Sequence, residues 1–116
     1  MQAINLAAKL STFAGFWQPR VVGQFNSHDL MVVKVKGEFT WHSHDDTDDF
    51  FLVLSGRLSI QLRTGNVMVG PGELFVVPRG VEHRPVAEEE THMLLIERQG
   101  TPNTGDRATA AVRREI

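Results

Sequence analysis

The sequence predicts an all-β protein, either an antiparallel sandwich or a small barrel, and three observations lead to this expectation. From residue 21 onward the chain consists largely of apolar runs rich in Val, Leu, Ile and Phe, which Gly, Pro or Asn interrupts at short intervals. Residues 57–63 (RLSIQLR) alternate apolar and polar side chains, as a strand with one solvated face does. Residues that suit tight turns separate the runs, at 55–56 (SG), 64–66 (TGN) and 70–72 (GPG).

The N-terminal residues 4–13 (INLAAKLSTF) predict one short helix, with Asn5 or Ser11 as capping candidates, or an extended segment before the first strand. Beyond them, strands are expected within the ranges 30–42, 50–80 and 91–97.

At 116 residues and 13.0 kDa the chain fits a single domain, 1–116. Its core barrel is expected at about 20–98. Residues 99–116 contain Gly, Pro, Asn and Thr with few large apolar side chains, which predicts a loosely docked C-terminal tail.

Composition excludes several classes of function. The net charge of −2 and the lack of a basic stripe argue against nucleic-acid or membrane partners. The absence of Cys removes disulfides, thiolate nucleophiles and thiolate metal ligands, so nitrogen and oxygen must hold any metal. No secretion signal and no long apolar run is visible, and we expect a soluble, unprocessed, cytoplasmic chain.

The chemistry of the sequence is concentrated in residues 41–50 (WHSHDDTDDF). If this segment is extended, His42 and His44 share one face about 6.5 to 7 Å apart and converge on one ion, although two surface histidines in a polar turn would leave the same pattern. Asp49, which begins the next apolar run, and His83 add a carboxylate and a third imidazole. Such a set holds a divalent metal and leaves coordination positions open for substrate or water.

The other acidic and imidazole groups are expected to stay outside this set. Asp45, Asp46 and Asp48 predict a solvated loop, because four aspartates exceed what one metal needs. His28 and His92 lack a partner pattern, so we interpret the first as turn surface and the second as a strand position.

These residues resemble the two motifs of the cupin superfamily, small metal-binding β-barrels, over about residues 28–97. The first motif matches Gly37, His42, His44, Asp49 and Gly56, and the second matches Gly72, Pro78, Gly80 and His83. The resemblance implies a small single-domain cupin with a β-barrel or jelly-roll fold. It also implies that His42, His44, Asp49 and His83 bind a divalent transition metal, which could be Fe, Mn, Ni, Co, Cu or Zn.

Three positions depart from the cupin pattern. The spacing from Gly37 to His42 is one residue short, and Ala87 stands where the second motif has Asn. Asp49 replaces the usual Glu, and its side chain is one methylene shorter. Asp49 is therefore either a metal ligand or a group beside a site of three histidines.

Alternation also predicts what surrounds the site. Phe51 and Val53 share the parity of Asp49 and are expected to line an apolar pocket beside the metal. If His42 and His44 face the interior, alternation sends Phe39 and Trp41 to the opposite face, where exposed aromatic rings would be costly.

Two arrangements would cover these rings. A second copy would make the protein a homodimer, and the N-terminal aromatic residues Phe13, Phe16 and Trp17 would cover them within one chain. The cations available for an anionic substrate are Arg57, Arg63, Arg79 and Arg84. None is favoured as a site residue, since Arg57 and Arg63 lie on the solvated face of their strand and Arg84 has the parity opposite to that of His83.

The leading functional hypothesis is a metal-dependent enzyme that acts on a small organic acid or sugar-like metabolite, as a dioxygenase, isomerase, decarboxylase or lyase. The alternatives are a non-catalytic module that binds a small molecule or metal, and metal-free epimerase chemistry in which an aspartate orients a histidine base. An enzyme should lose turnover but keep its fold when His44→Ala is made, whereas a binding module should turn over nothing.

Overall fold

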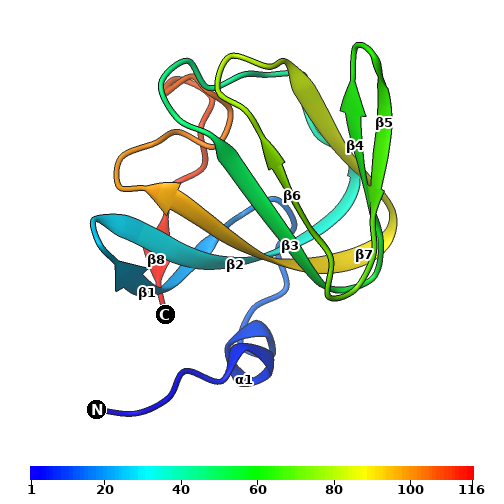
Figure 1. The fold of residues 1–116 in the computed structure, drawn as a ribbon. Coiled ribbons are helices and arrows are strands. Elements are labelled where there is room, and N and C mark those ends of the chain that lie inside the picture. Colours follow the sequence, from blue (N-terminus) through cyan, green and yellow to red (C-terminus); the bar gives the residue numbers. More distant parts are fainter.

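A computed structural model describes all residues, 1–116, and confirms the all-β expectation (Figure 1). The elements are α1 (Leu6–Leu10), β1 (Arg20–Phe25), β2 (His28–Glu38), β3 (Asp49–Ser55), β4 (Leu58–Leu62), β5 (Gly65–Val69), β6 (Leu74–Val77), β7 (His83–Arg98) and β8 (Arg114–Glu115).

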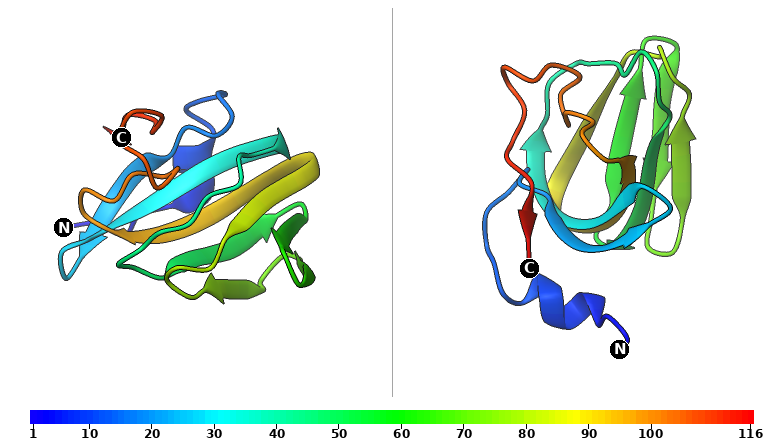
Figure 2. Two further views of the ribbon diagram at one scale, coloured as in Figure 1. Left: turned by 90° about the horizontal axis from the view of Figure 1, so that it is seen from above. Right: turned by 90° about the vertical axis from the view of Figure 1, so that its left-hand side faces the viewer.

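The long strand β7 organises the barrel. It pairs with β2 along one edge, while its other edge pairs first with β4 and then with β3. From there β4 continues to β5 and β3 continues to β6, all in antiparallel register. Figure 2 shows the result, in which β1 and β2 face β3, β4, β5 and β6 across the interior. The fold is a small jelly-roll barrel, as predicted.

The core fills the space between these two halves and follows the alternation of the strands. In β7, Thr91, Met93, Leu95 and Glu97 are all buried, because every second side chain of this strand points inward. The remaining buried apolar side chains of the core cluster are Val21, Met31, Val33, Val35, Phe51, Val53, Leu58, Ile60, Val69, Val77 and Ala87.

The N-terminal segment forms the helix that was one of the two expected structures. Asn5 caps it, because its side chain accepts a hydrogen bond from the backbone N–H of Ala8 at 2.9 Å. Figure 1 shows α1 outside the barrel. None of the helical structure is long or apolar enough to span a membrane.

The C-terminal segment 99–116 returns to the barrel, where β8 pairs in parallel with β1. Just before β8, Arg113 forms ion pairs with Asp29 of β2 at 2.9 Å and with Glu97 of β7 at 2.5 Å. Both carboxylates are buried, so this arginine fixes the segment across two strands.

The turn between β3 and β4 provides a first test of the packing. Gly56 has φ +85°, and a Cβ placed there would lie 2.7 Å from the Glu90 carbonyl oxygen and 2.8 Å from Thr91 Cα. We expect Gly56→Ala to lower the free energy of unfolding by about 2 to 4 kcal/mol, through backbone strain plus overpacking.

The matched control is Gly72→Ala, at a similar φ of +78° with nothing within 4 Å of the added Cβ. It should cost only the backbone strain, about 1 kcal/mol. Urea unfolding measures both variants, and equal losses would show that the close approach at Gly56 is not rigid.

Candidate metal centre

The four predicted ligands come together at one end of the barrel because three separate segments meet there. Strand β2 ends at Glu38, after a bulge between Val35 and Gly37, and the chain continues irregularly to β3. Within this stretch His42 forms a bridge with His83, each donating its backbone N–H to the carbonyl of the other at 3.0 and 2.9 Å.

The backbone also fixes the remaining two residues of the set. The carbonyl of His44 accepts a 2.7 Å hydrogen bond from the N–H of Gly80, which ties this histidine to the turn before β7. Asp49 is the first residue of β3 and pairs with Val77 of β6. The ring nitrogens and the carboxylate thereby converge within 4.8 Å of one another.

One carboxylate oxygen faces all three imidazoles. Asp49 Oδ2 lies 2.8 Å from His83 Nε2, 3.2 Å from His44 Nε2 and 3.9 Å from His42 Nε2. Neighbouring ligands of a metal with bonds of about 2.0–2.2 Å lie roughly 3 Å apart, so two of these separations already match. All four side chains are buried, with residue exposures of 9% or less.

The hydrogen bonds of the Nδ1 atoms determine whether the Nε2 atoms, which face Asp49, carry a hydrogen. His42 Nδ1 lies 2.9 Å from the Thr40 carbonyl oxygen, and His83 Nδ1 lies 2.9 Å from that of Val81. A carbonyl only accepts, so each Nδ1 carries a hydrogen, and in the neutral ring Nε2 presents a lone pair inward.

Lone pairs of neutral imidazoles and a carboxylate repel one another, so the cluster requires added positive charge at its centre. His44 Nε2 is buried and has no hydrogen-bond partner, so this nitrogen is free to ligate a cation. Imidazole and carboxylate together are a ligand set that divalent transition metals accept. The residues present therefore fit a metal ion.

Without a metal, protons would supply this charge. Burial by itself would raise the pKa of the Asp49 carboxyl, but the surrounding imidazoles of His42, His44 and His83 keep it far below its usual value. Burial likewise opposes the charged form of His44, yet the Asp49 carboxylate raises the pKa of this imidazole overall. The cluster thus has a strong affinity for positive charge.

The other candidates lie outside the cluster. Asp45, Asp46 and Asp48 are exposed, and Asp48 accepts a hydrogen bond from the backbone N–H of Arg79. His28 contacts the carbonyl of Asn26 in a turn, whereas His92 on β7 pairs with Glu90.

The prediction for Phe39 was wrong. Its ring lies edge-on to His42, with centroids 5.3 Å apart, and it faces the site instead of the outer surface. Strict alternation fails because residues 39–48 do not form a regular strand. Trp17 stacks on Phe39 at 4.8 Å, so the N-terminal segment does cover this ring.

Trp41 does point away from the site, and the guanidinium of Arg63 covers its ring at 3.7 Å. With both rings covered within one chain, their exposure no longer argues for a homodimer. The homodimer stays a prediction, which light scattering at micromolar concentration tests.

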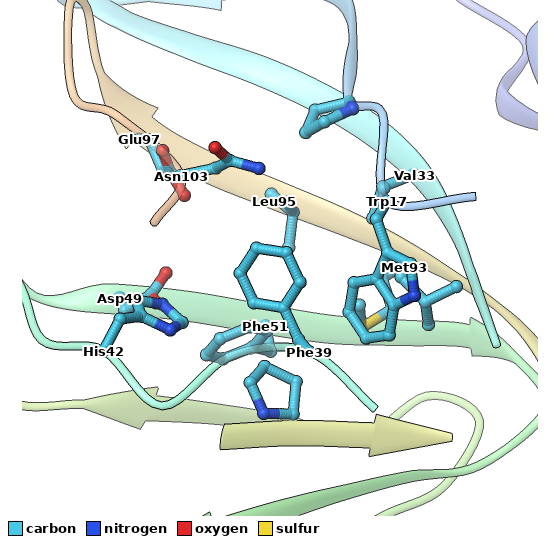
Figure 3. A pocket seen from close by; sticks show the side chains of 13 residues that line it. Trp17, Val33, Phe39, His42, Asp49, Phe51, Met93, Leu95, Glu97 and Asn103 are labelled. Carbon is cyan, nitrogen blue, oxygen red and sulfur yellow. The ribbon is translucent and has the colours of Figure 1, made fainter. Parts of the chain in front are cut away.

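A cavity of about 40 Å³ adjoins the cluster (Figure 3). Phe51 is one of its lining residues, whereas Val53 is fully buried in the core and is not. The lining residues are Trp17, Pro19, Val33, Val35, Phe39, His42, Asp49, Phe51, Pro85, Met93, Leu95, Glu97 and Asn103.

Two polar residues of this cavity were not predicted. Glu97 shares the parity of Met93 and Leu95 along β7, so alternation could have placed it inside. Asn103 comes from the C-terminal segment and has no local pattern that would have indicated its position.

Glu97 is 5% exposed and adjoins the metal cluster. Burial raises its pKa to about 7, and the negative charge of Asp49 adds to this effect, whereas Arg113 opposes it. In the metal-free protein, Glu97 therefore exchanges a proton near neutral pH.

This shift has a consequence for stability in the metal-free protein. Because the folded-state pKa of Glu97 is about 7 and the ordinary value is 4.5, the folded state binds the proton more tightly, and stability falls as pH rises between these values. Relative to the unmodified protein, the unfolding free energy of the Glu97→Gln variant should therefore increase by on the order of 2–3 kcal/mol between pH 4.5 and pH 7.5.

Urea unfolding of both proteins in a chelator, at several pH values, measures this gain. Glu88→Gln, an exposed position on the same strand, is the control and should show no comparable gain. A constant difference between Glu97→Gln and the unmodified protein would contradict the raised pKa.

The family model of the cupin domain matches residues 29–97, more than half of the chain. The protein belongs to the cupin family. Among curated proteins, this cupin is 30% identical over 77 residues to the uncharacterized protein YdbB of Bacillus subtilis (strain 168), a match that covers 66% of this chain and 68% of YdbB.

Solved structures agree with this assignment. A cupin-2 domain containing protein from Shewanella frigidimarina superposes with a TM-score of 0.82 and 45% identity, over 83% of this chain and 94% of that one. The hydroquinone 1,2-dioxygenase PnpCD, in complex with Cd²⁺ and 4-hydroxybenzonitrile, superposes with a TM-score of 0.69 over 91% of this chain and 74% of that one. At 15% identity this second likeness shows the fold alone.

Proposed function

We propose that this cupin is a metal-dependent enzyme in which His42, His44, His83 and Asp49 hold one divalent transition metal ion. The observation that carries the proposal is the convergence of the three Nε2 atoms on one buried carboxylate oxygen, with the Nδ1 hydrogens of His42 and His83 turned outward. A metal bound there would act as a Lewis acid or, if it is iron, as a site of oxygen chemistry.

The chain itself contributes orientation and exclusion of water. The carbonyls of Thr40 and Val81 hold the rings of His42 and His83 in the ligating tautomer. Phe51, Leu95 and Met93 form apolar walls beside the site, which keep the substrate side of the cluster dry. Glu97 is placed to exchange a proton with a substrate in the cavity.

Titration of chelator-treated protein with Co²⁺ tests metal binding directly, since the visible absorption of Co²⁺ changes with its ligands. We expect saturation at about one ion per chain, loss of the signal in His42→Ala, and an unchanged titration in His92→Ala, whose imidazole lies elsewhere. Identical titration curves for His42→Ala and His92→Ala would contradict the assignment of the metal to this cluster.

The spectrum of Asp49→Asn separates the two roles left open for the carboxylate. A changed spectrum would make Asp49 a ligand, whereas an unchanged spectrum with weaker binding would leave a site of three histidines beside a charge.

Catalysis is tested by incubating the metal-loaded protein with panels of small molecules while product formation and oxygen consumption are followed. This separates the dioxygenase from the isomerase, decarboxylase and lyase reactions. His44→Ala should abolish turnover and retain the far-UV circular dichroism of the fold.

The small size of the cavity, about 40 Å³, favours a second candidate, a module that binds a metal without turnover. It predicts a full metal site together with no product from any panel. If instead no metal binds, the 2.8 Å pair of His83 and Asp49 would be left as an acid–base couple.

A further inference from the structure

The cavity beside the cluster has no Lys or Arg side chain to pair with an anionic ligand. Its ionisable lining groups are Asp49, Glu97 and His42, and no Lys or Arg lines it. Arg113 is adjacent to Glu97, but Asp29, Glu97 and the Thr101 carbonyl already occupy its guanidinium. In the metal-free protein, a carboxylate or phosphate in this cavity would lose its hydration without a free Lys or Arg to pair with.

The remaining walls are apolar, and the polar groups gather at one end. Figure 3 shows Asp49, His42, Glu97 and Asn103 toward one side of the cavity, and Trp17 with Met93 toward the other. The cavity is therefore amphipathic along its length, with hydrogen-bonding groups beside the metal cluster and aromatic and aliphatic groups away from it.

An aromatic stack closes the apolar end. The rings of Trp17 and Phe39 are 4.8 Å apart and nearly parallel, at 20°. The cavity volume of about 40 Å³ is far below the roughly 300–1,000 Å³ of typical ligand pockets, so an organic ligand would have to displace part of this wall.

Trp17 is the part of the wall suited to move. Its φ is +60°, in the left-handed region that bulky side chains rarely adopt, and it precedes the first strand in an irregular segment. Its backbone N–H and indole Nε1 donate to the carbonyls of Lys34 and Lys36, at 2.8 and 3.0 Å. Turning the indole outward would break the second of these bonds and open the cavity next to Phe39.

We propose that the cavity selects a small, flat, neutral molecule with an apolar body and a hydroxyl group at one end, the chemistry of a phenol. The ring would occupy the space that Trp17 vacates beside Phe39, and the hydroxyl would face Glu97 and Asn103. This deepens the proposed function, and rests on it, by narrowing the substrate from organic acids and sugars to neutral aromatic alcohols.

The test compares three probes by isothermal titration calorimetry: 4-methylphenol, 4-methylbenzoate, which carries a carboxylate in place of the hydroxyl, and glucose. Each is titrated into both metal-loaded and metal-free protein. In the metal-free form we expect 4-methylphenol to bind at least roughly tenfold more tightly than 4-methylbenzoate, because the anion would lose its hydration without a Lys or Arg to pair with; glucose should bind neither form.

Trp17 provides a second measurement that does not depend on turnover. The chain has no Tyr and two Trp, so Trp41→Phe leaves Trp17 as the sole fluorophore of the two residue types. The fluorescence is excited at wavelengths where phenols do not absorb. The emission of Trp17 should then shift to the red as 4-methylphenol binds and the indole becomes more exposed. Trp17→Ala should change the affinity for 4-methylphenol at least roughly tenfold, whereas Trp41→Ala should not.

The outcomes separate this inference from the proposed function. If 4-methylbenzoate binds the metal-free protein as tightly as 4-methylphenol, or if no probe binds either form, the inference fails even when the metal titrates normally. If 4-methylphenol binds selectively and shifts the emission of Trp17 while no metal binds, the cavity inference holds and the metal proposal fails.

Discussion

Saturating the chelator-treated protein with a divalent transition metal is expected to raise its melting temperature by roughly 10 °C. The reason is linkage: the ion would join His42 and His44 from the irregular segment 39–48, Asp49 from β3 and His83 from β7, and the unfolded chain has no such site. Free metal at 100 times its dissociation constant contributes about 2.7 kcal/mol to the folded state.

Differential scanning calorimetry with and without added Mn²⁺ or Zn²⁺ measures this shift. His44→Ala should remove most of it, and His92→Ala, a histidine of β7 outside the cluster, should retain it. If the metal binds but both variants shift equally, the ion lies elsewhere on the protein.

Replacing Arg113 by Met should lower the free energy of unfolding by about 2 to 4 kcal/mol. Arg113 is the partner of two carboxylates, Asp29 and Glu97, whose side chains are 11% and 5% exposed. Without the arginine, both would be buried without a cation. The loss should be smaller at low pH, because the pKa of Glu97 is already raised to about 7 and protonation relieves its charge.

Arg114→Met is the matched control, since Arg114 is the exposed neighbour in β8 and forms no ion pair. Its cost should stay within about 0.5 kcal/mol. The Arg113 variant should also become sensitive to proteolysis between 99 and 112, because β8 alone pairs over only two residues. Equal unfolding curves for the two variants would contradict the role assigned to Arg113.

The strands and the cluster were predictable because both depend on short-range patterns. Alternation in residues 57–63 indicated which side chains share the apolar face, and the structure buries Leu58 and Ile60 accordingly. The histidines and Asp49 were singled out by their spacing, and the barrel does bring them together.

The features that were missed depend on irregular backbone or on distant contacts. Phe39 faces the cavity because the chain leaves the strand after Glu38, where alternation no longer applies. Arg113 and Asn103 reach the site only through the path of the C-terminal segment, which no local pattern specifies. Glu97 was not predicted because glutamate is usually exposed, although its position in the alternation of β7 places it inside.

The most direct test of the metal centre is the metal content of protein purified without a chelator or a histidine tag, determined by plasma mass spectrometry. We expect about one divalent transition metal ion per chain, lost in His83→Ala and retained in His92→Ala. Protein that carries no such ion and takes up none on dialysis against Fe²⁺, Mn²⁺, Ni²⁺, Co²⁺, Cu²⁺ or Zn²⁺ would contradict the proposed metalloenzyme.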